Sequence, residues 1–152
     1  MIFWLYYKNS KFIYYQSCLL FATEQYKGAL QQLNEPLEIE KDKCRWNISI
    51  RVLNILIFIE LNKLNEAKIS TETLRKYIER VSKSNNVEER DLLITKLLRE
   101  IVKDNFHFNQ KNTKVTTLLK ELSQKDKPTS WNYYTPELIP FHEWVMTLPV
   151  KQ

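Results

Sequence analysis

The chain contains a single glycine, Gly28, among its 152 residues. Turns with positive φ, loops that cradle phosphate and strand-to-helix elbows mostly depend on glycine. A nucleotide-binding α/β fold or a β-sandwich would therefore be unusual for this sequence. Helices that are joined by Asn, Lys and Asp turns need no glycine, so the composition favours an all-α protein.

Apolar residues recur at helical spacing along most of the chain. Positions i, i+3, i+4 and i+7 form one face of an amphipathic helix, and five segments fit that spacing. Each predicts a helix with one apolar stripe. The first set is Tyr15, Cys18, Leu19 and Ala22, and the others begin at Tyr26, Leu74, Ile94 and Val115.

The segment Trp46–Leu61, WNISIRVLNILIFIEL, is apolar on nearly all sides and rich in β-branched residues. A buried strand is an alternative, because periodicity alone does not separate the two for short apolar runs. The absence of Gly and Pro over a length above that of a usual strand favours a helix that packs on more than one side. Because the segment is also shorter than the roughly 20 residues of a membrane span, we expect no membrane partner. The two cysteines, Cys18 and Cys44, make no disulfide framework and fit a reducing compartment, so we expect a cytoplasmic protein.

Helix boundaries predict one all-α domain over residues 1–152, with six or seven helices. Pro36 would end the second helix, because proline removes a hydrogen-bond donor. Short loops make consecutive helices antiparallel, so we expect a stack of helical hairpins with a C-terminal capping helix. Thr135 would cap that helix, Pro136 would open it, and Pro140 predicts a kink or a late start. The expected units are 11–36, 47–84, a looser hairpin 88–124, a linker 124–134 and the C-terminal helix 136–148.

Two helix openings share an apolar residue, two spacers and an alanine: Tyr26-Lys27-Gly28-Ala29 and Leu64-Asn65-Glu66-Ala67. The two alanines are 38 residues apart, a period typical of helical repeats. A small residue fits where two helices of a hairpin approach most closely. Over roughly residues 11–84 the chain resembles a degenerate tetratricopeptide repeat protein. Ser17 and Ile55 depart from the small residue that this family prefers there.

The resemblance implies a scaffold that binds protein or peptide segments in a groove lined by the first helix of each pair. The groove positions in the second helical pair, Ser49, Val52, Leu56 and Ile59, are nearly all apolar. Either a partner or the chain's own C-terminal segment should therefore cover them. The partner-binding candidates are Lys11, Tyr14, Phe21, Ser49, Val52 and Leu56, with Cys18 and Ile59 on the same faces.

The chain starts with the apolar sequence MIFWLYYKNSKF. Terminal repeats usually present a polar outer face. This start therefore predicts either that the chain is the C-terminal part of a longer array or that it self-associates through its N-terminus.

The two histidines are the first candidates for chemistry. His142 and Glu143 are adjacent, so on a helix they point about 100° apart, and no ligand type lies three or four residues from His142. His107 follows a helix end, where capping or loop packing explains it. The chain has no CxxC or HExxH motif, and its two cysteines make no disulfide framework. We expect no metal, no cofactor and no catalytic residue.

The C-terminal segment carries the densest aromatic cluster. The cluster could be a ligand platform, but an apolar stripe of Leu138, Phe141, Val145 and Leu148 favours a role in anchoring this segment to the helices. The aromatic residues are Trp131, Tyr133, Tyr134, Phe141 and Trp144.

The net charge of +5 arises within residues 63–127. Nucleic-acid binding through a basic face of residues 75–103 is one reading of this excess. Acidic residues alternate with the basic ones, however, and no aromatic residues accompany them for base stacking. We therefore expect a non-catalytic protein–protein interaction scaffold, with nucleic-acid binding as the alternative. The two cationic stripes are Lys76, Arg80 and Lys83, and Lys96, Arg99 and Lys103.

Overall fold

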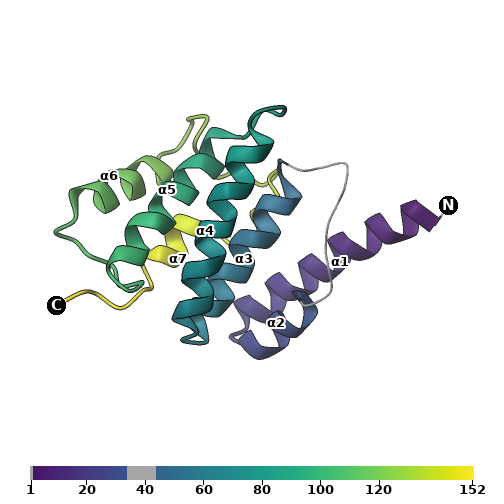
Figure 1. Cartoon of the computed structure of the whole chain (residues 1–152), viewed down its shortest axis with the longest axis horizontal. Coiled ribbons are helices and arrows are strands. Elements are labelled where there is room, and N and C mark those ends of the chain that lie inside the picture. The colour runs from purple at the N-terminus through teal and green to yellow at the C-terminus, as the bar shows by residue number, and fades with distance from the viewer. Residues whose placement is uncertain (1, 34–43) are drawn as a thin grey trace.

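The computed structural model describes residues 2–33 and 44–152, with side chains from Ser10 onward. Within these ranges the chain forms seven α-helices and no β-strand, which confirms the all-α class (Figure 1). Pro36 lies outside the described residues. The helices are α1 Ile2–Ala22, α2 Tyr26–Leu33, α3 Trp46–Glu60, α4 Leu64–Val81, α5 Glu89–Lys103, α6 Thr113–Leu122 and α7 Phe141–Val145.

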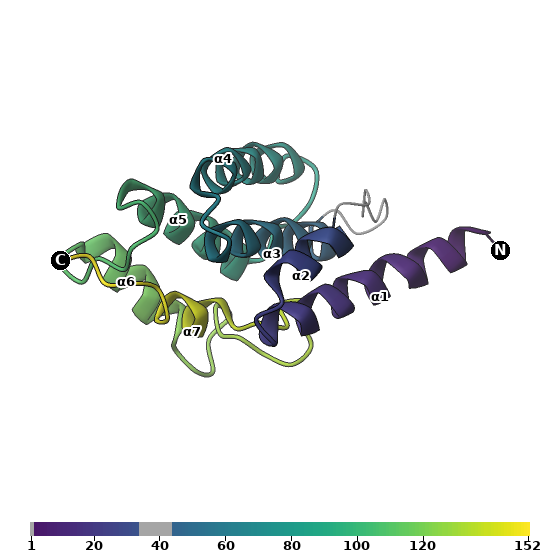
Figure 2. The same ribbon diagram turned by 90° about the horizontal axis from the view of Figure 1, so that it is seen from below.

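Consecutive helices pack in pairs. Helix α1 packs on α2, α3 on α4 and α5 on α6, and α2–α3 and α4–α5 contacts join the pairs. Figure 1 shows the pairs following one another along the long axis, from the N-terminal end of α1 to α6. Figure 2 shows the first part of α1 projecting beyond α2.

Helix α3 is the centre of the core. The segment predicted to be a helix that packs on more than one side, with a strand as the alternative, is a helix, and ten of its fifteen residues are buried. Helices α2 and α4 and the C-terminal segment all lie against α3. If α3 had only one apolar face, the polar residues on its other faces would be buried. This is the physical reason for its nearly continuous Ile, Leu and Val sequence.

The two alanines of the shared motif lie at close helix approaches. Ala29 and Ala67 are both 0% exposed. Ser17, also fully buried, donates a hydrogen bond of 2.9 Å from its Oγ to the Ala29 carbonyl. Its hydroxyl is therefore satisfied, and its small size lets α1 and α2 approach.

The turns adopt left-handed backbone without glycine. Glu24, Asn62 and Asn105 have φ of 60°, 56° and 51° at the ends of α1, α3 and α5. Asparagine tolerates this region better than most residues. Gly28 lies inside α2, where an added Cβ would lie 3.6 Å from Leu20 Cδ1, an ordinary contact.

The C-terminal helix is shorter than the predicted range 136–148, since α7 spans only Phe141–Val145. Thr135 does not cap a helix; its Oγ1 donates to the Asn132 carbonyl at 3.1 Å. Pro140 disfavours helical backbone at the residue before it and becomes the N-cap of α7, so the late start is confirmed. Residues 124–134 contain no helix, as expected.

The C-terminal segment returns across the molecule and joins the core. Figure 2 shows it running from the end of α6 toward α1 and then back through α7. Phe141 and Val145 are 0% exposed, and Trp144 and Leu148 are buried. Trp144 Nε1 donates to Glu60 Oε1 at 2.8 Å, and the Phe108 amide donates to the Pro149 carbonyl at 2.8 Å. The aromatic cluster therefore anchors this segment, with Tyr133 and Tyr134 exposed.

We expect Phe141→Ala to lower the free energy of unfolding by about 3–5 kcal/mol, because it leaves a cavity among fully buried neighbours. Urea unfolding followed by circular dichroism measures the change. Tyr134→Ala is the matched control: this side chain is 93% exposed, so its removal should change stability by less than about 0.5 kcal/mol. Equal effects of the two changes would contradict the burial of α7.

Candidate functional site

A buried ion pair fixes the C-terminal segment. Arg90, in the first turn of α5, is 4% exposed. Its Nε donates to Glu137 Oε2 at 2.5 Å, and its Nη2 donates to Glu137 Oε1 at 2.8 Å. A two-point contact of this kind matches the planar guanidinium to the carboxylate.

The other guanidinium hydrogens of Arg90 are also satisfied. Its Nη1 donates to the carbonyls of Leu122 at 3.0 Å and Thr129 at 2.7 Å. Its Nη2 lies 3.1 Å from Nδ1 of His142. Because arginine can only donate, the His142 Nδ1 accepts, and its proton resides on Nε2. Burial, together with the Arg90 charge, lowers the pKa of His142, so this ring is neutral near pH 7.

Glu137 extends the same network into the C-terminal segment. Its Oε1 accepts from the Phe141 amide at 2.8 Å, at the start of α7. Its carbonyl accepts from Trp131 Nε1 at 2.7 Å. One residue earlier, the Pro136 carbonyl accepts from Tyr14 Oη at 2.6 Å. Thus the network that positions α7 also ties the segment to α1. We call Arg90, Glu137 and His142 the buried clasp.

The C-terminal segment covers part of the surface that the repeat resemblance assigns to a partner. Four of the candidates line a cavity of about 20 Å³ whose other walls include Glu137 and Ile139. The sequence left two possible covers for this apolar surface, and the structure places the chain's own segment there. Those four are Tyr14, Ser49, Val52 and Leu56, with exposures of 2%, 8%, 7% and 2%.

The remaining candidates lie elsewhere. Phe21 is buried with its ring 5.2 Å from that of Tyr26. Lys11 is half-buried, and its Nζ lies 4.5 Å from the centre of the Trp46 ring. On the same helix, burial raises the pKa of the Cys18 thiol to about 12, which leaves it unreactive.

The apolar N-terminus falls partly outside the described side chains. From Ser10 onward, Phe12 and Leu19 are 59% and 66% exposed on α1. Tyr15 on the same face is 44% exposed and stacks edge-on against Trp46. Self-association through the apolar N-terminus, MIFWLYYKNSKF, stays a prediction.

Next to the buried clasp lies Asp91, a partly buried carboxyl group. Burial raises its pKa to about 7, and the nearby Glu137 and Glu88 carboxylates add to the rise. Arg90 and Arg45 oppose it without cancelling it. Asp91 is therefore partly protonated at neutral pH.

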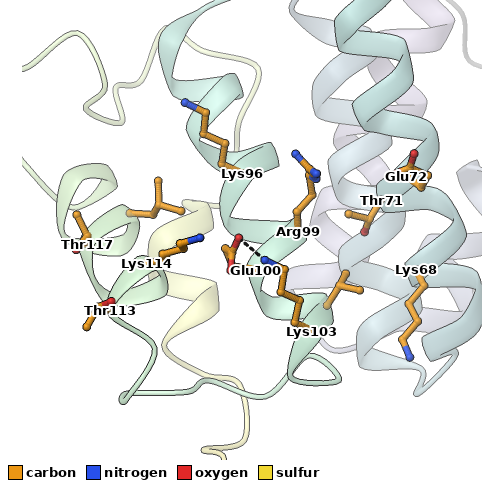
Figure 3. A pocket seen from close by; sticks show the side chains of 12 residues that line it. Lys68, Thr71, Glu72, Lys96, Arg99, Glu100, Lys103, Thr113, Lys114 and Thr117 are labelled. Atoms are coloured by element: carbon orange, nitrogen blue, oxygen red, sulfur yellow. Dashed lines mark hydrogen bonds and ion pairs between the residues drawn. The ribbon is translucent and has the colours of Figure 1, made fainter.

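A second feature is an open groove of about 660 Å³ between α4, α5 and α6. Figure 3 shows α5 running between the other two helices, with labelled side chains from all three. We call it the basic groove. It is lined by Lys68, Thr71, Glu72, Lys96, Arg99, Glu100, Val102, Lys103, Thr113, Lys114, Thr117 and Leu118.

The basic groove has an excess of three positive charges, from five cationic and two anionic side chains. Glu100 pairs with Lys103 at 2.7 Å, and this hydrogen bond lowers the pKa of Glu100. Glu72 is held by Arg75, which lies outside the lining and lowers the pKa of Glu72 in the same way. Both carboxylates are therefore ionised and already engaged.

Two cations of the basic groove have partners of their own and three do not. Lys103 pairs with Glu100, and Lys68 donates to Asn105 Oδ1 at 3.0 Å. Among the described residues, no side-chain hydrogen bond or ion pair within 4 Å involves Lys96, Arg99 or Lys114. Arg99 acts electrostatically on Glu72 and Lys114 acts on Glu100. Because two carboxylates face five cations, the groove keeps an excess of positive charge for an anionic ligand.

The two cationic stripes seen in the sequence have different positions. Lys96, Arg99 and Lys103 line the basic groove, whereas Lys76, Arg80 and Lys83 lie outside it. Arg80 stacks on the Tyr77 ring at 5.3 Å. Of the two stripes, the one on α5 therefore belongs to the basic groove and the one on α4 does not.

Sequence reasoning missed the buried clasp and half of the basic groove. Arg90 and Glu137 are 47 residues apart, and no local spacing connects them. Lys68 and Lys114 join the groove only because α4 and α6 flank α5. One signal was present: the first-turn position of Arg90 is unfavourable for a cation at a helix N-terminus, which hints at a specific anionic partner.

The exposed histidine has a local structural contact. Nδ1 of His107 is 3.1 Å from the carbonyls of both Asp104 and Asn105, so it donates to the end of α5. Neither His107 nor His142 lines the basic groove. Within the described residues, no three His, Cys, Asp or Glu side chains come close enough together to hold a metal ion.

We expect Glu137→Gln to destabilise the fold by about 3–5 kcal/mol, because it leaves the buried Arg90 charge uncompensated. Adding Arg90→Met to this variant should recover part of the loss by removing that charge. Glu66→Gln, an exposed carboxylate in the first turn of α4, serves as control and should cost less than about 0.5 kcal/mol. If Glu137→Gln behaves like Glu66→Gln, the ion pair does not hold the C-terminal segment.

The raised pKa of Asp91 predicts a pH-dependent gain in stability for Asp91→Asn. Between pH 4 and 7 the unfolded chain ionises this group while the folded chain keeps it protonated, so wild-type stability falls as pH rises. The variant should therefore match wild type near pH 4 and exceed it by about 1–3 kcal/mol above pH 7, with partial exposure reducing the full effect. Urea unfolding at pH 4, 6 and 8 tests this, and a pH-independent difference would contradict it.

No family model, curated protein or solved structure matches this chain. Among the described helices, none combines the length and apolar character that crossing a membrane requires. The two features of the described residues that bear on function are therefore the basic groove and the buried clasp.

Proposed function

We propose that this chain is a non-catalytic protein–protein interaction scaffold of helical-repeat type. The pairwise packing of α1–α2, α3–α4 and α5–α6 supports the repeat-like arrangement. The observation that carries the proposal is the basic groove: an open surface of about 660 Å³ whose lining has five cations against two carboxylates.

The C-terminal segment covers the other candidate surface, which favours the basic groove as the binding site for a partner. Tyr14, Ser49, Val52 and Leu56 lie under that segment, so a partner reaches them only if the buried clasp opens. The basic groove requires no such rearrangement, and rigid surfaces bind at a lower entropic cost than surfaces that must first be uncovered.

A binding role fits the available side chains better than catalysis does. An enzyme that used either histidine would need that ring in a pocket with a second polar group. His142 has Arg90 beside it, but it lies in the buried clasp and accepts a structural hydrogen bond. The groove itself offers lysine, arginine and threonine side chains, which suit recognition of an anion.

Site-specific photocrosslinking in the cells that produce this protein tests the proposal. We expect a photoreactive phenylalanine at Thr117, in the groove, to form a covalent adduct with a discrete protein that mass spectrometry identifies. The same group at Tyr134, exposed but outside the groove, is the control and should not capture that protein. The identified partner, once purified, should bind wild type and lose at least about tenfold in affinity for Arg99→Glu/Lys114→Glu, because each reversal removes one attraction and adds a repulsion.

Two outcomes contradict the proposal. One is the absence of any adduct specific to Thr117. The other is an adduct that nuclease, but not protease, removes, which would support the alternative of nucleic-acid binding through residues 75–103.

A further inference from the structure

We propose that the basic groove binds an acidic, amphipathic helical segment of a partner protein, with carboxylates on Lys96, Arg99 and Lys114 and an apolar side chain on Val102 and Leu118. This inference rests on the proposed function and names the chemistry of its partner. It follows from the charges, their spacing and the composition of the groove.

The unpaired cations come from two helices and face a common hollow. Lys96 and Arg99 are exposed on α5, and Lys114 is exposed on α6. Figure 3 shows Lys114 directed toward α5 across the groove. Arg99 can bind a carboxylate through two parallel hydrogen bonds, whereas the lysines act as point charges. An acidic ligand would neutralise an excess that the described residues leave uncompensated.

The spacing of the α5 cations suits a helix. Lys96, Arg99 and Lys103 occupy positions i, i+3 and i+7 and extend over about 10 Å of the α5 axis. A partner helix that runs alongside α5 has the same rise per residue, so carboxylates at i and at i+3 or i+4 can face Lys96 and Arg99, whereas Lys103 is already paired with Glu100.

Part of the groove lining is apolar, which favours a ligand with an apolar side chain at that point. Val102 on α5 and Leu118 on α6 are both half-buried and line the groove. Because they can accept a leucine-sized side chain, the matching segment alternates acidic and apolar positions at helical spacing. A uniformly charged polymer would leave this contact unused.

Nucleic acid fits the same groove less well. None of its twelve lining residues is aromatic, so bases have no stacking platform. The ionised Glu72 and Glu100 also face the hollow and would repel a continuous phosphate backbone. A protein segment can place neutral side chains at those points.

The end of the chain itself is a poor occupant. Its last residues include Lys151, which pairs with Asp104 outside the groove lining, and the Lys151 amide donates to Phe108. The segment from Pro136 to Val145 is held by the buried clasp on the far side of α5. The groove is therefore open to a second molecule.

Fluorescence anisotropy with defined probes tests the inference. The first probe is a labelled helical peptide of Glu, Leu and Ala, about 16 residues or roughly 24 Å long. The second has every Glu replaced by Gln, and the third is a single-stranded RNA of similar length. We expect the Glu peptide to bind at least about tenfold more tightly than the other two and to weaken as salt rises from about 0.05 to 0.5 M.

Matched variants locate the binding. Arg99→Glu/Lys114→Glu should weaken the Glu peptide at least about tenfold. Lys83→Glu/Lys120→Glu changes the net charge equally at exposed positions outside the groove and should have little effect. Thermal unfolding checks that both variants fold, and amide chemical shifts of wild type should change along α5 and α6 on peptide addition.

Each alternative result overturns the inference. Equal binding of the Gln peptide, or equal loss in the two double variants, would show that the groove does not select acidic segments. Tighter binding of RNA with the same dependence on Arg99 and Lys114 would contradict the proposed function as well. A photocrosslinked protein partner whose contacting segment is neutral or basic would overturn the inference alone and leave the scaffold role intact.

Discussion

The buried contact between Arg90 and Glu137 determines how the C-terminal segment lies on the helices. A charged pair removed from water is stable only when its geometry is good and its remaining hydrogens are bonded. Here the guanidinium uses the Glu137 carboxylate, two carbonyls and His142. These acceptors come from the end of α6, the linker, the stretch just before α7 and α7 itself. Satisfying one side chain of α5 therefore brings together four parts of the chain that lie more than 30 residues beyond it.

The C-terminal segment, held by this contact, covers one side of the helices and leaves the other side open. The apolar face of α3 and the buried part of α1 lie under the C-terminal segment, and Tyr14 joins them through the Pro136 carbonyl. On the other side, α4, α5 and α6 form the basic groove, which no described segment fills. An apolar surface left bare would promote aggregation, whereas a groove of exposed cations is stable in water. The same chain can therefore keep its groove open while its core stays closed.

Local periodicity was enough to predict the helices but not the contacts between distant residues. The stripes from Tyr26, Leu74, Ile94 and Val115 each correspond to a helix, because burial of one face selects that spacing. The C-terminal helix was predicted too long, since Thr135 and Pro136 look like a helix start but are bonded in a turn. The α5 half of the basic groove was visible as a cationic stripe. Its α4 and α6 halves, and the pairing of Arg90 with Glu137, depend on tertiary packing that no local spacing encodes.

The segment around His142, one of the two histidines considered for chemistry, illustrates how burial assigns roles. Phe141 and Val145 fill the core, Trp144 donates to Glu60, and His142 accepts from Arg90. Because burial, together with the Arg90 charge, lowers the pKa of His142, the neutral ring accepts the Arg90 hydrogen bond that helps to hold the C-terminal segment. Lys96, Arg99 and Lys114 have the opposite character: they are exposed, and within residues 10–33 and 44–152 no side-chain hydrogen bond holds them. Polar groups that are satisfied within the fold stabilise it, whereas convergent charges that remain unsatisfied on a concave surface are free to recognise another molecule.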